Sequence, residues 1–204
     1  MRWLSLHLRA RRVPMAAAVV VGVIALTWVS WPVFSDGQTI NTRMISVTVM
    51  LAVVAIGTTL SGADDALDHT ASVSWPTRRA AHLLLCAAAV IGLLLVTTLT
   101  DARFEPLGVV ARNTAGLLGL TALGAALLGA ALSWIAPLVW TIVAIMPWMG
   151  PSGQLRMQLG AWLVQPAGTS AATVCATLLA VAGLVAYTVR GCPLRPAAET
   201  VPHN

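Results

Sequence analysis

The chain has 204 residues, of which 58% are hydrophobic and 9% are charged, and its formal net charge is +5 at pH 7. Soluble domains carry about 25% charged residues, so this composition excludes an ordinary soluble globular domain. The three cysteines are scattered and form no ligand-spaced cluster with histidine, so we expect neither a disulfide framework nor a metal or other cofactor.

Residues 1–13 carry arginines among apolar side chains, ahead of the first apolar stretch. Trp3 and Leu4 can lie in the lipid headgroup layer while Arg2 and Arg9 meet lipid phosphates. The segment therefore predicts a short interfacial elbow helix in contact with membrane lipids.

Six apolar stretches follow, and none of them contains Asp, Glu, Arg or Lys. They are Pro14–Phe34, Met44–Gly62, Ala80–Thr100, Thr114–Trp134, Ile135–Met149 and Thr169–Val189. A helix needs about 20 residues to cross a hydrocarbon core about 30 Å thick, and five of the stretches have about that length. The sequence predicts an all-α integral membrane protein with six transmembrane helices in one domain, residues 1–204.

The most charged connection, 63–79, follows the second stretch and reads ADDALDHTASVSWPTRR. Its Asp64, Asp65 and Asp68 form the pattern by which membrane prenyltransferases hold Mg²⁺, since carboxylates one helical turn apart chelate a hard cation. Such enzymes need a second acidic cluster, and the remaining acidic residues of this chain are dispersed. A Mg²⁺-dependent transferase that uses these aspartates therefore stays an alternative.

The apolar run from Thr114 to Met149 is too long for one crossing. Pro137 cannot donate to the helical ladder, so we expect a tight hairpin at Ser133–Ala136. Small residues recur every four positions on the fourth stretch, a spacing that favours close helix packing. They are Thr121, Ala125, Gly129 and Ser133.

Segment 147–168 mixes prolines and glycines with apolar residues such as Leu155, Trp162 and Leu163. It is too interrupted to span a membrane and too apolar for an ordinary loop. We expect a re-entrant or interfacial piece on the outer side, with its irregular backbone buried in protein.

Arginine placement predicts the orientation. With six alternating spans, eight of the twelve arginines fall on the side of the N-terminus: Arg2, Arg9, Arg11, Arg12, Arg78, Arg79, Arg190 and Arg195. The positive-inside rule places that side, including the tail 190–204, in the cytoplasm. The positive charge thus matches anionic lipid rather than nucleic acid, and the composition is typical of a bacterial cell-membrane protein.

Lysine is absent, since all twelve basic residues are arginine. A phosphate-binding loop of the form G-x-x-x-x-G-K-[ST] needs its lysine on the nucleotide phosphates, so this chain cannot supply one. The predicted spans also lack a charged group for proton coupling. If the protein transports, another chain must bind the ATP.

The order of these features resembles the permease subunits of ABC-2 type exporters, in the compact form common in actinobacteria. Such permeases have an elbow helix, six spans, a cytoplasmic docking loop after span two, an inner hairpin between spans four and five, and outer re-entrant pieces. Local similarity lies in ALDHTAS, WPTRRAAHLL, ARNTAGLLGLTALGAALLGAALSWIAPLVW and WLVQPAGTSAA.

The resemblance implies a nonenzymatic subunit that pairs with a second permease chain, identical or a sister, and with a separate ATPase. It implies that the ATPase docks on residues of the loop 63–79: Asp64, Asp65, Leu67, Asp68, His69, Arg78 and Arg79. A structural or assembly membrane protein without transport is the competing hypothesis.

Overall fold

The computed structural model describes residues 12–61, 75–100, 102–104, 106–151 and 153–193. Within these ranges the chain consists of helices, turns and one isolated bridge between Thr39 and Arg103. The predicted all-α class is therefore confirmed for this part of the chain. Most of the predicted elbow helix at 1–13 and most of the tail 190–204 lie outside the described residues.

Among the described residues, four helical segments are long and apolar enough to cross a membrane. They are α2 (Val13–Phe34), α5 (Trp75–Val96) with its continuation η1 (Thr97–Leu99), α6 (Leu107–Leu128) and α9 (Ser170–Arg190). The shorter elements are α3 (Thr42–Gly57), η2 (Ala130–Leu132), α7 (Ile135–Ile145), α8 (Leu155–Gly160) and η3 (Trp162–Val164).

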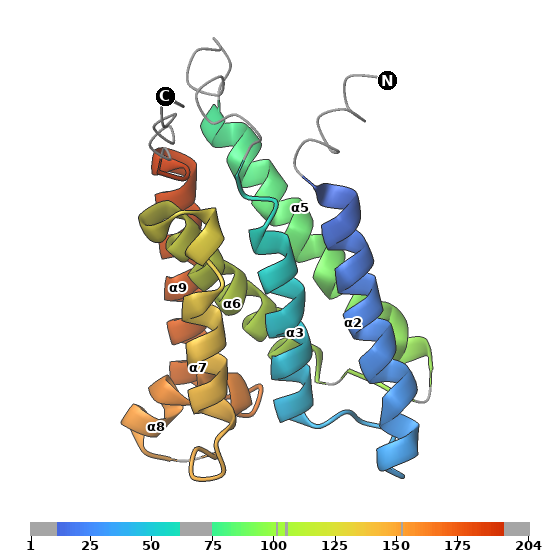
Figure 1. The fold of residues 1–204 in the computed structure, drawn as a ribbon. Coiled ribbons are helices and arrows are strands. Elements are labelled where there is room, and N and C mark those ends of the chain that lie inside the picture. Colours follow the sequence, from blue (N-terminus) through green and yellow to red (C-terminus); the bar gives the residue numbers. More distant parts are fainter. Residues whose placement is uncertain (1–11, 62–74, 101, 105, 152, 194–204) are drawn as a thin grey trace, which may run out of the picture.

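The helices α2, α3, α5, α6, α7 and α9 run in alternating directions along one bundle (Figure 1). α2 and α5 begin, and α9 ends, at one end of the bundle, which we call the terminal end. The connection through η2 also lies toward this end, whereas α8 lies at the opposite end, which we call the α8 end. The described connections between these antiparallel neighbours are thus confined to one end or the other.

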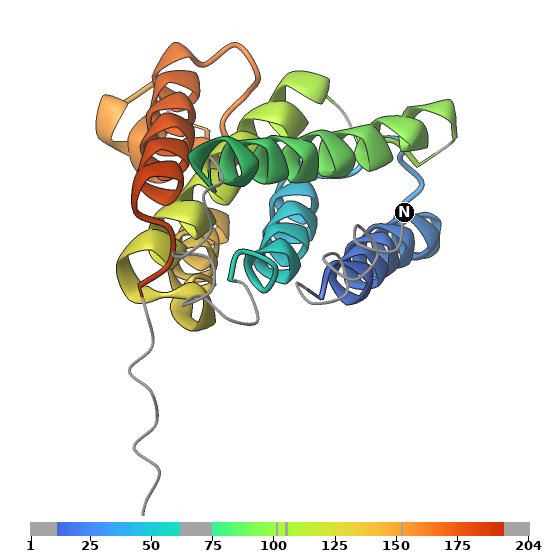
Figure 2. The ribbon, with the colours of Figure 1, turned by 90° about the horizontal axis from the view of Figure 1, so that it is seen from above.

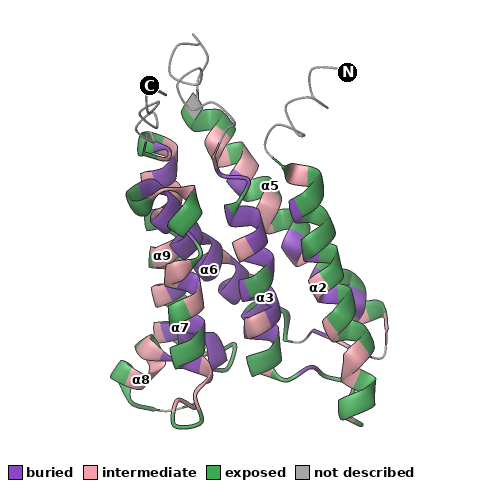
Figure 3. Ribbon diagram, in the orientation of Figure 1, coloured by how far each residue is buried: buried purple, intermediate pink, exposed green. Residues whose placement is uncertain are grey.

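α6 forms the centre of the bundle, where it packs against α9, α3 and α5. Most of its residues are buried, as Figure 3 shows. Its Gly119 faces Gly183 of α9, and a Cβ atom on either glycine would overlap backbone atoms of the other helix. The two backbones therefore touch, which only small residues allow. Between membrane helices, such close van der Waals packing drives association, because the surrounding lipid is as apolar as the helices.

α5 crosses the bundle obliquely, as the view from above shows (Figure 2). Near its start, the Arg79 guanidinium lies beside Gly191 at the end of α9. Beyond its other end, Thr100 accepts a 2.9 Å hydrogen bond from the Trp28 indole of α2. α5 thus passes from α9 to α2 along its length, and α2 and α5 diverge toward the terminal end.

The predicted fourth span, Thr114–Trp134, is displaced by about two turns, because α6 runs from Leu107 to Leu128. The helix begins earlier because the charged Arg112 is buried and hydrogen-bonded rather than solvated. It ends earlier because Gly129 adopts a φ of 86°. The hairpin predicted at Ser133–Ala136 consequently lies at 129–134.

Other boundaries also differ from the prediction. α5 begins at Trp75 rather than Ala80, and Pro76 fits its first turn, where no backbone donor is needed. α3 ends at Gly57, after which the Thr59 hydroxyl donates to the carbonyl of Ile56. α7 stops at Ile145, four residues short of the predicted Met149.

Candidate functional site

The predicted docking residues are divided by the limits of the described chain. Five lie outside the described residues: Asp64, Asp65, Leu67, Asp68 and His69. Arg78 and Arg79, predicted in the loop, lie instead in the first turns of α5. A Cβ atom on Gly191 would lie 2.5 Å from Cζ of Arg79, and Gly191 has a φ of 68°. Glycine at this position therefore lets Arg79 connect the start of α5 with the end of α9.

Hydrogen bonds also fix the end of α3, immediately before residues 62–74. The buried Tyr187 of α9 donates its hydroxyl to the carbonyl of Leu60 at 2.7 Å, and the Cys192 thiol lies 3.6 Å from the same oxygen. Thr59 Oγ1 lies 2.9 Å from His82 Nε2 on α5. The helix ends that flank 62–74 are therefore bound to each other and to α9.

The His82–Cys86 contact on α5 has the residue types of a nucleophile and base, but not the required proton positions. Thr59 donates its hydroxyl proton to the carbonyl of Ile56 at 2.7 Å, so its oxygen accepts from His82 Nε2. Nε2 consequently carries a proton and cannot accept one from the Cys86 thiol, 3.8 Å away. The contact holds α3 to α5 and does not activate the thiol.

A buried polar cluster lies where α6 meets segment 147–168. Arg112 is 6% exposed, and its guanidinium donates to the carbonyls of Gln165 at 2.7 Å and Pro166 at 3.0 Å. Its Nε also donates to the side-chain oxygen of Asn113 at 3.3 Å. A charged donor with three oxygen acceptors can be buried at a cost that the hydrogen bonds offset.

Asn113 extends this cluster to α3. Its Nδ2 donates to the carbonyl of Leu163 at 2.8 Å and to Ser46 Oγ at 3.1 Å, and Ser46 Oγ in turn lies 3.2 Å from the same carbonyl. Both polar side chains are fully buried. We call Arg112 and Asn113 the clamp, because together they bind the backbone carbonyls of three residues of the 147–168 segment, Leu163, Gln165 and Pro166.

The 147–168 segment is held by further contacts. Trp140 of α7 donates to the carbonyl of Gly160 at 3.0 Å, and Gln165 Nε2 donates to the carbonyl of Gly150 at 3.1 Å. Trp162 is fully buried with its ring against Gly116 of α6, where a Cβ atom would overlap it. The irregular backbone between α7 and α9 is therefore bonded to the bundle rather than left free.

The four residues of the predicted packing stripe do not all lie on one helix. Thr121 and Ala125 are fully buried in α6, and Thr121 packs against Gly57 of α3. Gly129 caps α6, and Ser133 lies in the following turn, where it is buried against Gly57. The closest helix contact instead uses Gly119 and Gly183, which the four-residue spacing does not select.

Sequence reasoning missed the clamp because charge alone was used to place the start of the fourth span. Two signals could have identified it: an Arg-Asn pair directly before an apolar run, and Gln165-Pro166 in a segment whose carbonyls lack helical partners. A guanidinium near such carbonyls is more favourable than one directed at hydrocarbon.

Within the described residues, no group of three or more His, Cys, Asp or Glu side chains could hold a metal ion. Side-chain contacts join helix ends at the terminal end, and a hydrogen-bonded segment lies at the α8 end. Comparison with protein-family models, curated proteins and solved structures finds no significant match to this chain.

Proposed function

We propose that this chain is the permease subunit of an ABC-2 type exporter in a bacterial cell membrane, with six spans and both termini in the cytoplasm. The observation that carries the proposal is that the two ends of the bundle are built differently. The terminal end joins the helix ends flanking 62–74 to α9 through Tyr187 and Arg79. The α8 end carries a folded segment fixed by the clamp.

The two short helices are compatible with six spans. α3 has 16 residues, which give about 24 Å of helix against a core of about 30 Å. Ten of its residues are buried, so neighbouring parts of the protein cover most of the helix. α7 is preceded by η2, and together they cover 130–145. A span shorter than the hydrocarbon core is accommodated by local thinning of the bilayer at a modest cost.

The clamp supports a re-entrant reading of segment 147–168. Irregular backbone at membrane depth is stable only when its polar groups are satisfied within the protein. The clamp satisfies the carbonyls of Leu163, Gln165 and Pro166, and Trp140 satisfies that of Gly160. In an exporter, such a segment would close the outer end of the pathway.

An ABC-type ATPase is the proposed partner on the cytoplasmic side, because the chain has no lysine for a phosphate loop of its own. A second permease chain, identical or a sister, would complete the pathway. Movement of an ATPase docked at 62–79 would pass directly to α3, α5 and α9, since Leu60, His82 and Arg79 couple these helices.

Replacement of Asp64, Asp65 and Asp68 together by asparagine should leave the chain inserted but weaken its co-purification with the cognate ATPase by well over tenfold. Acidic residues contribute little to membrane orientation. Loss of charge pairs from a buried polar contact costs about 2–5 kcal/mol, and each 1.4 kcal/mol is tenfold in affinity. The measurement is pull-down of the ATPase at matched membrane expression.

Asp36→Asn is the matched control, since Asp36 is an exposed aspartate on the connection between α2 and α3, at the α8 end. Its pull-down should equal that of the unmodified chain. Undiminished ATPase binding by the triple variant would refute these aspartates as docking residues. A Mg²⁺-dependent transferase predicts lost catalysis with assembly unchanged, and a structural protein predicts no ATPase in the pull-down at all.

A further inference from the structure

A groove runs between α2 and α5 along most of their length. Its part nearest the terminal end has a volume of about 280 Å³, and the next part has about 220 Å³ and shares Val21 and Leu93 with the first. A third part of about 540 Å³ shares Trp28 and Thr100 with the second. The shared residues place these three parts in a row between α2 and α5, and we call this row the α2–α5 groove.

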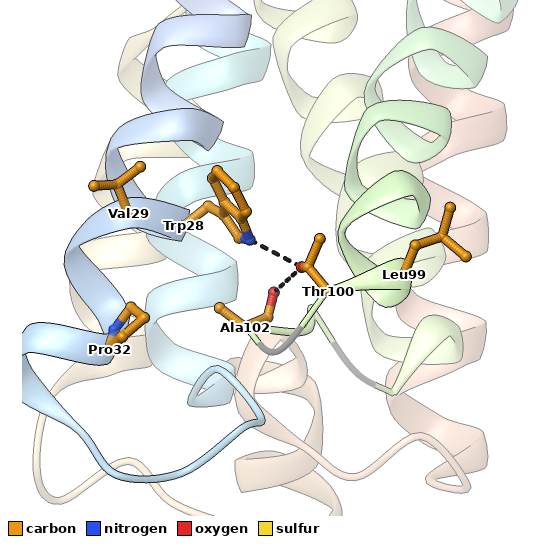
Figure 4. A pocket seen from close by; sticks show the side chains of 6 residues that line it. All are labelled: Trp28, Val29, Pro32, Leu99, Thr100 and Ala102. Carbon is orange, nitrogen blue, oxygen red and sulfur yellow. Dashed lines mark hydrogen bonds between the residues drawn. The ribbon is translucent and has the colours of Figure 1, made fainter.

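A hydrogen bond divides the α2–α5 groove near the α8 end. Figure 4 shows the Trp28 indole pointing across toward Thr100, and its Nε1 donates to Thr100 Oγ1 at 2.9 Å. Thr100 Oγ1 also lies 3.4 Å from the carbonyl of Ala102. These polar groups satisfy one another, so the wall they form presents mainly apolar atoms to the first two parts of the groove.

The walls of the groove at the terminal end are apolar, with α3 as the floor. The polar side chains in this part, Thr59 and His82, are bonded to each other across the floor. Arg12, an exposed cation, immediately precedes Val13, which lines the groove. The groove therefore offers an apolar depression, and Arg12 directly precedes its lining at the terminal end.

The lipid-facing position of the groove narrows the choice of occupant. Only 17% of the most apolar window of α2 and 22% of that of α5 are buried, so these helices face the surroundings of the bundle. A helix is about 10–12 Å in diameter and cannot enter a groove of this volume, whereas a single hydrocarbon chain can. In a bilayer, the thin apolar groups that surround a protein are the acyl chains of phospholipids. The phosphate groups of the same lipids attract arginine.

We propose that the α2–α5 groove binds one acyl chain of an anionic membrane phospholipid, with the lipid phosphate beside Arg12. The inference rests on the membrane location proposed above but not on transport or on an ATPase. The bound chain would fill the space that opens because α5 leans away from α2 toward the terminal end. It would thereby stabilise the oblique position of α5.

Two pairs of adjacent alanines provide matched variants. Ala17 and Ala89 line the groove, whereas Ala18 and Ala88 are exposed on the same helices and do not line it. Ala17→Phe and Ala89→Phe place a ring in the groove, and Ala18→Phe and Ala88→Phe add the same ring outside it. Comparison within each pair separates groove filling from a general effect of phenylalanine on folding.

The experiment titrates the detergent-purified, delipidated full chain with phosphatidylglycerol or phosphatidylcholine and counts bound lipids by native mass spectrometry. We expect one phosphatidylglycerol per chain at saturation, at least tenfold weaker binding by Ala17→Phe and Ala89→Phe, and unchanged binding by Ala18→Phe and Ala88→Phe. Arg12→Gln should weaken phosphatidylglycerol binding severalfold and phosphatidylcholine binding less, because the choline ammonium offsets the charge of the phosphate.

Three results would overturn the proposal. The first is equal lipid binding by the groove variants and their controls, and the second is no stoichiometric lipid on the unmodified chain. The third is conversion of a dimer to a monomer by Ala17→Phe or Ala89→Phe with lipid binding unchanged, which would assign the groove to a second copy of the chain. None of these results depends on ATPase binding, so failure here leaves the docking experiment independent.

Discussion

Gly183→Leu should prevent the native contact between α6 and α9 and lower the stability of the folded chain by about 3 kcal/mol or more. Overpacking of a close interface typically costs about 1–3 kcal/mol, and here even a Cβ atom overlaps the backbone of Gly119, so no side-chain rotation relieves it. Thermal unfolding in detergent, followed by helical circular dichroism and size exclusion, measures the loss.

Gly92→Leu is the control for this variant. Gly92 lies inside α5, and a Cβ atom there meets nothing within 4 Å. Leucine at this half-buried position has open space around its Cβ atom, so it should leave the melting temperature unchanged or raise it, since glycine disfavours a helix by about 1 kcal/mol. Equal melting temperatures for Gly183→Leu and Gly92→Leu would contradict the close α6–α9 contact.

Arg112→Leu should release segment 147–168 from the bundle. The substitution leaves the carbonyls of Gln165 and Pro166 without their donors, at a cost of about 1–3 kcal/mol for each buried unsatisfied group. Hydrogen exchange of the amides in 161–168 should then accelerate by at least tenfold. Arg112→Lys should show an intermediate effect, because an ammonium lacks the planar fork that reaches both carbonyls.

Arg156→Leu provides the comparison for the clamp. Arg156 is an exposed arginine of α8, and its Nε donates a hydrogen bond to the side-chain oxygen of Gln154. Its loss should leave exchange in 161–168 within twofold of the unmodified chain, because surface pairs contribute little. Exchange as slow in Arg112→Leu as in the unmodified chain would show that the clamp does not hold the segment.

The sequence was sufficient to predict the helical class because apolar runs free of charge leave few alternatives to helices in a membrane. It was less reliable for the limits of those helices. Arg112 was placed outside a span because of its charge, but carbonyl oxygens of the neighbouring segment satisfy it. Pro137 marked a hairpin in the correct region, yet the turn depends on Gly129, whose positive φ cannot be recognised from spacing.

The closest contacts and the groove could not be predicted from local pattern. Gly119 is one of several small residues in α6, and only its position opposite Gly183 distinguishes it. The α2–α5 groove depends on the oblique path of α5, which is fixed by Arg79 at one end and by Thr100 at the other. These partners lie far away in the sequence, at Gly191 and Trp28, so no periodicity within α5 reveals them.

The orientation of the bundle tests the account most directly, because an ATPase can dock only if residues 62–74 face the cytoplasm. In a background with Cys86, Cys175 and Cys192 replaced, single cysteines are introduced and labelled in intact cells with a membrane-impermeant maleimide. Cysteines at Gln38, Glu105 and Gln154 should react from outside, whereas Asp68→Cys and Pro196→Cys should react only after the membrane is opened. Labelling of Asp68→Cys in intact cells would contradict the six-span topology and, with it, the proposed docking of an ATPase.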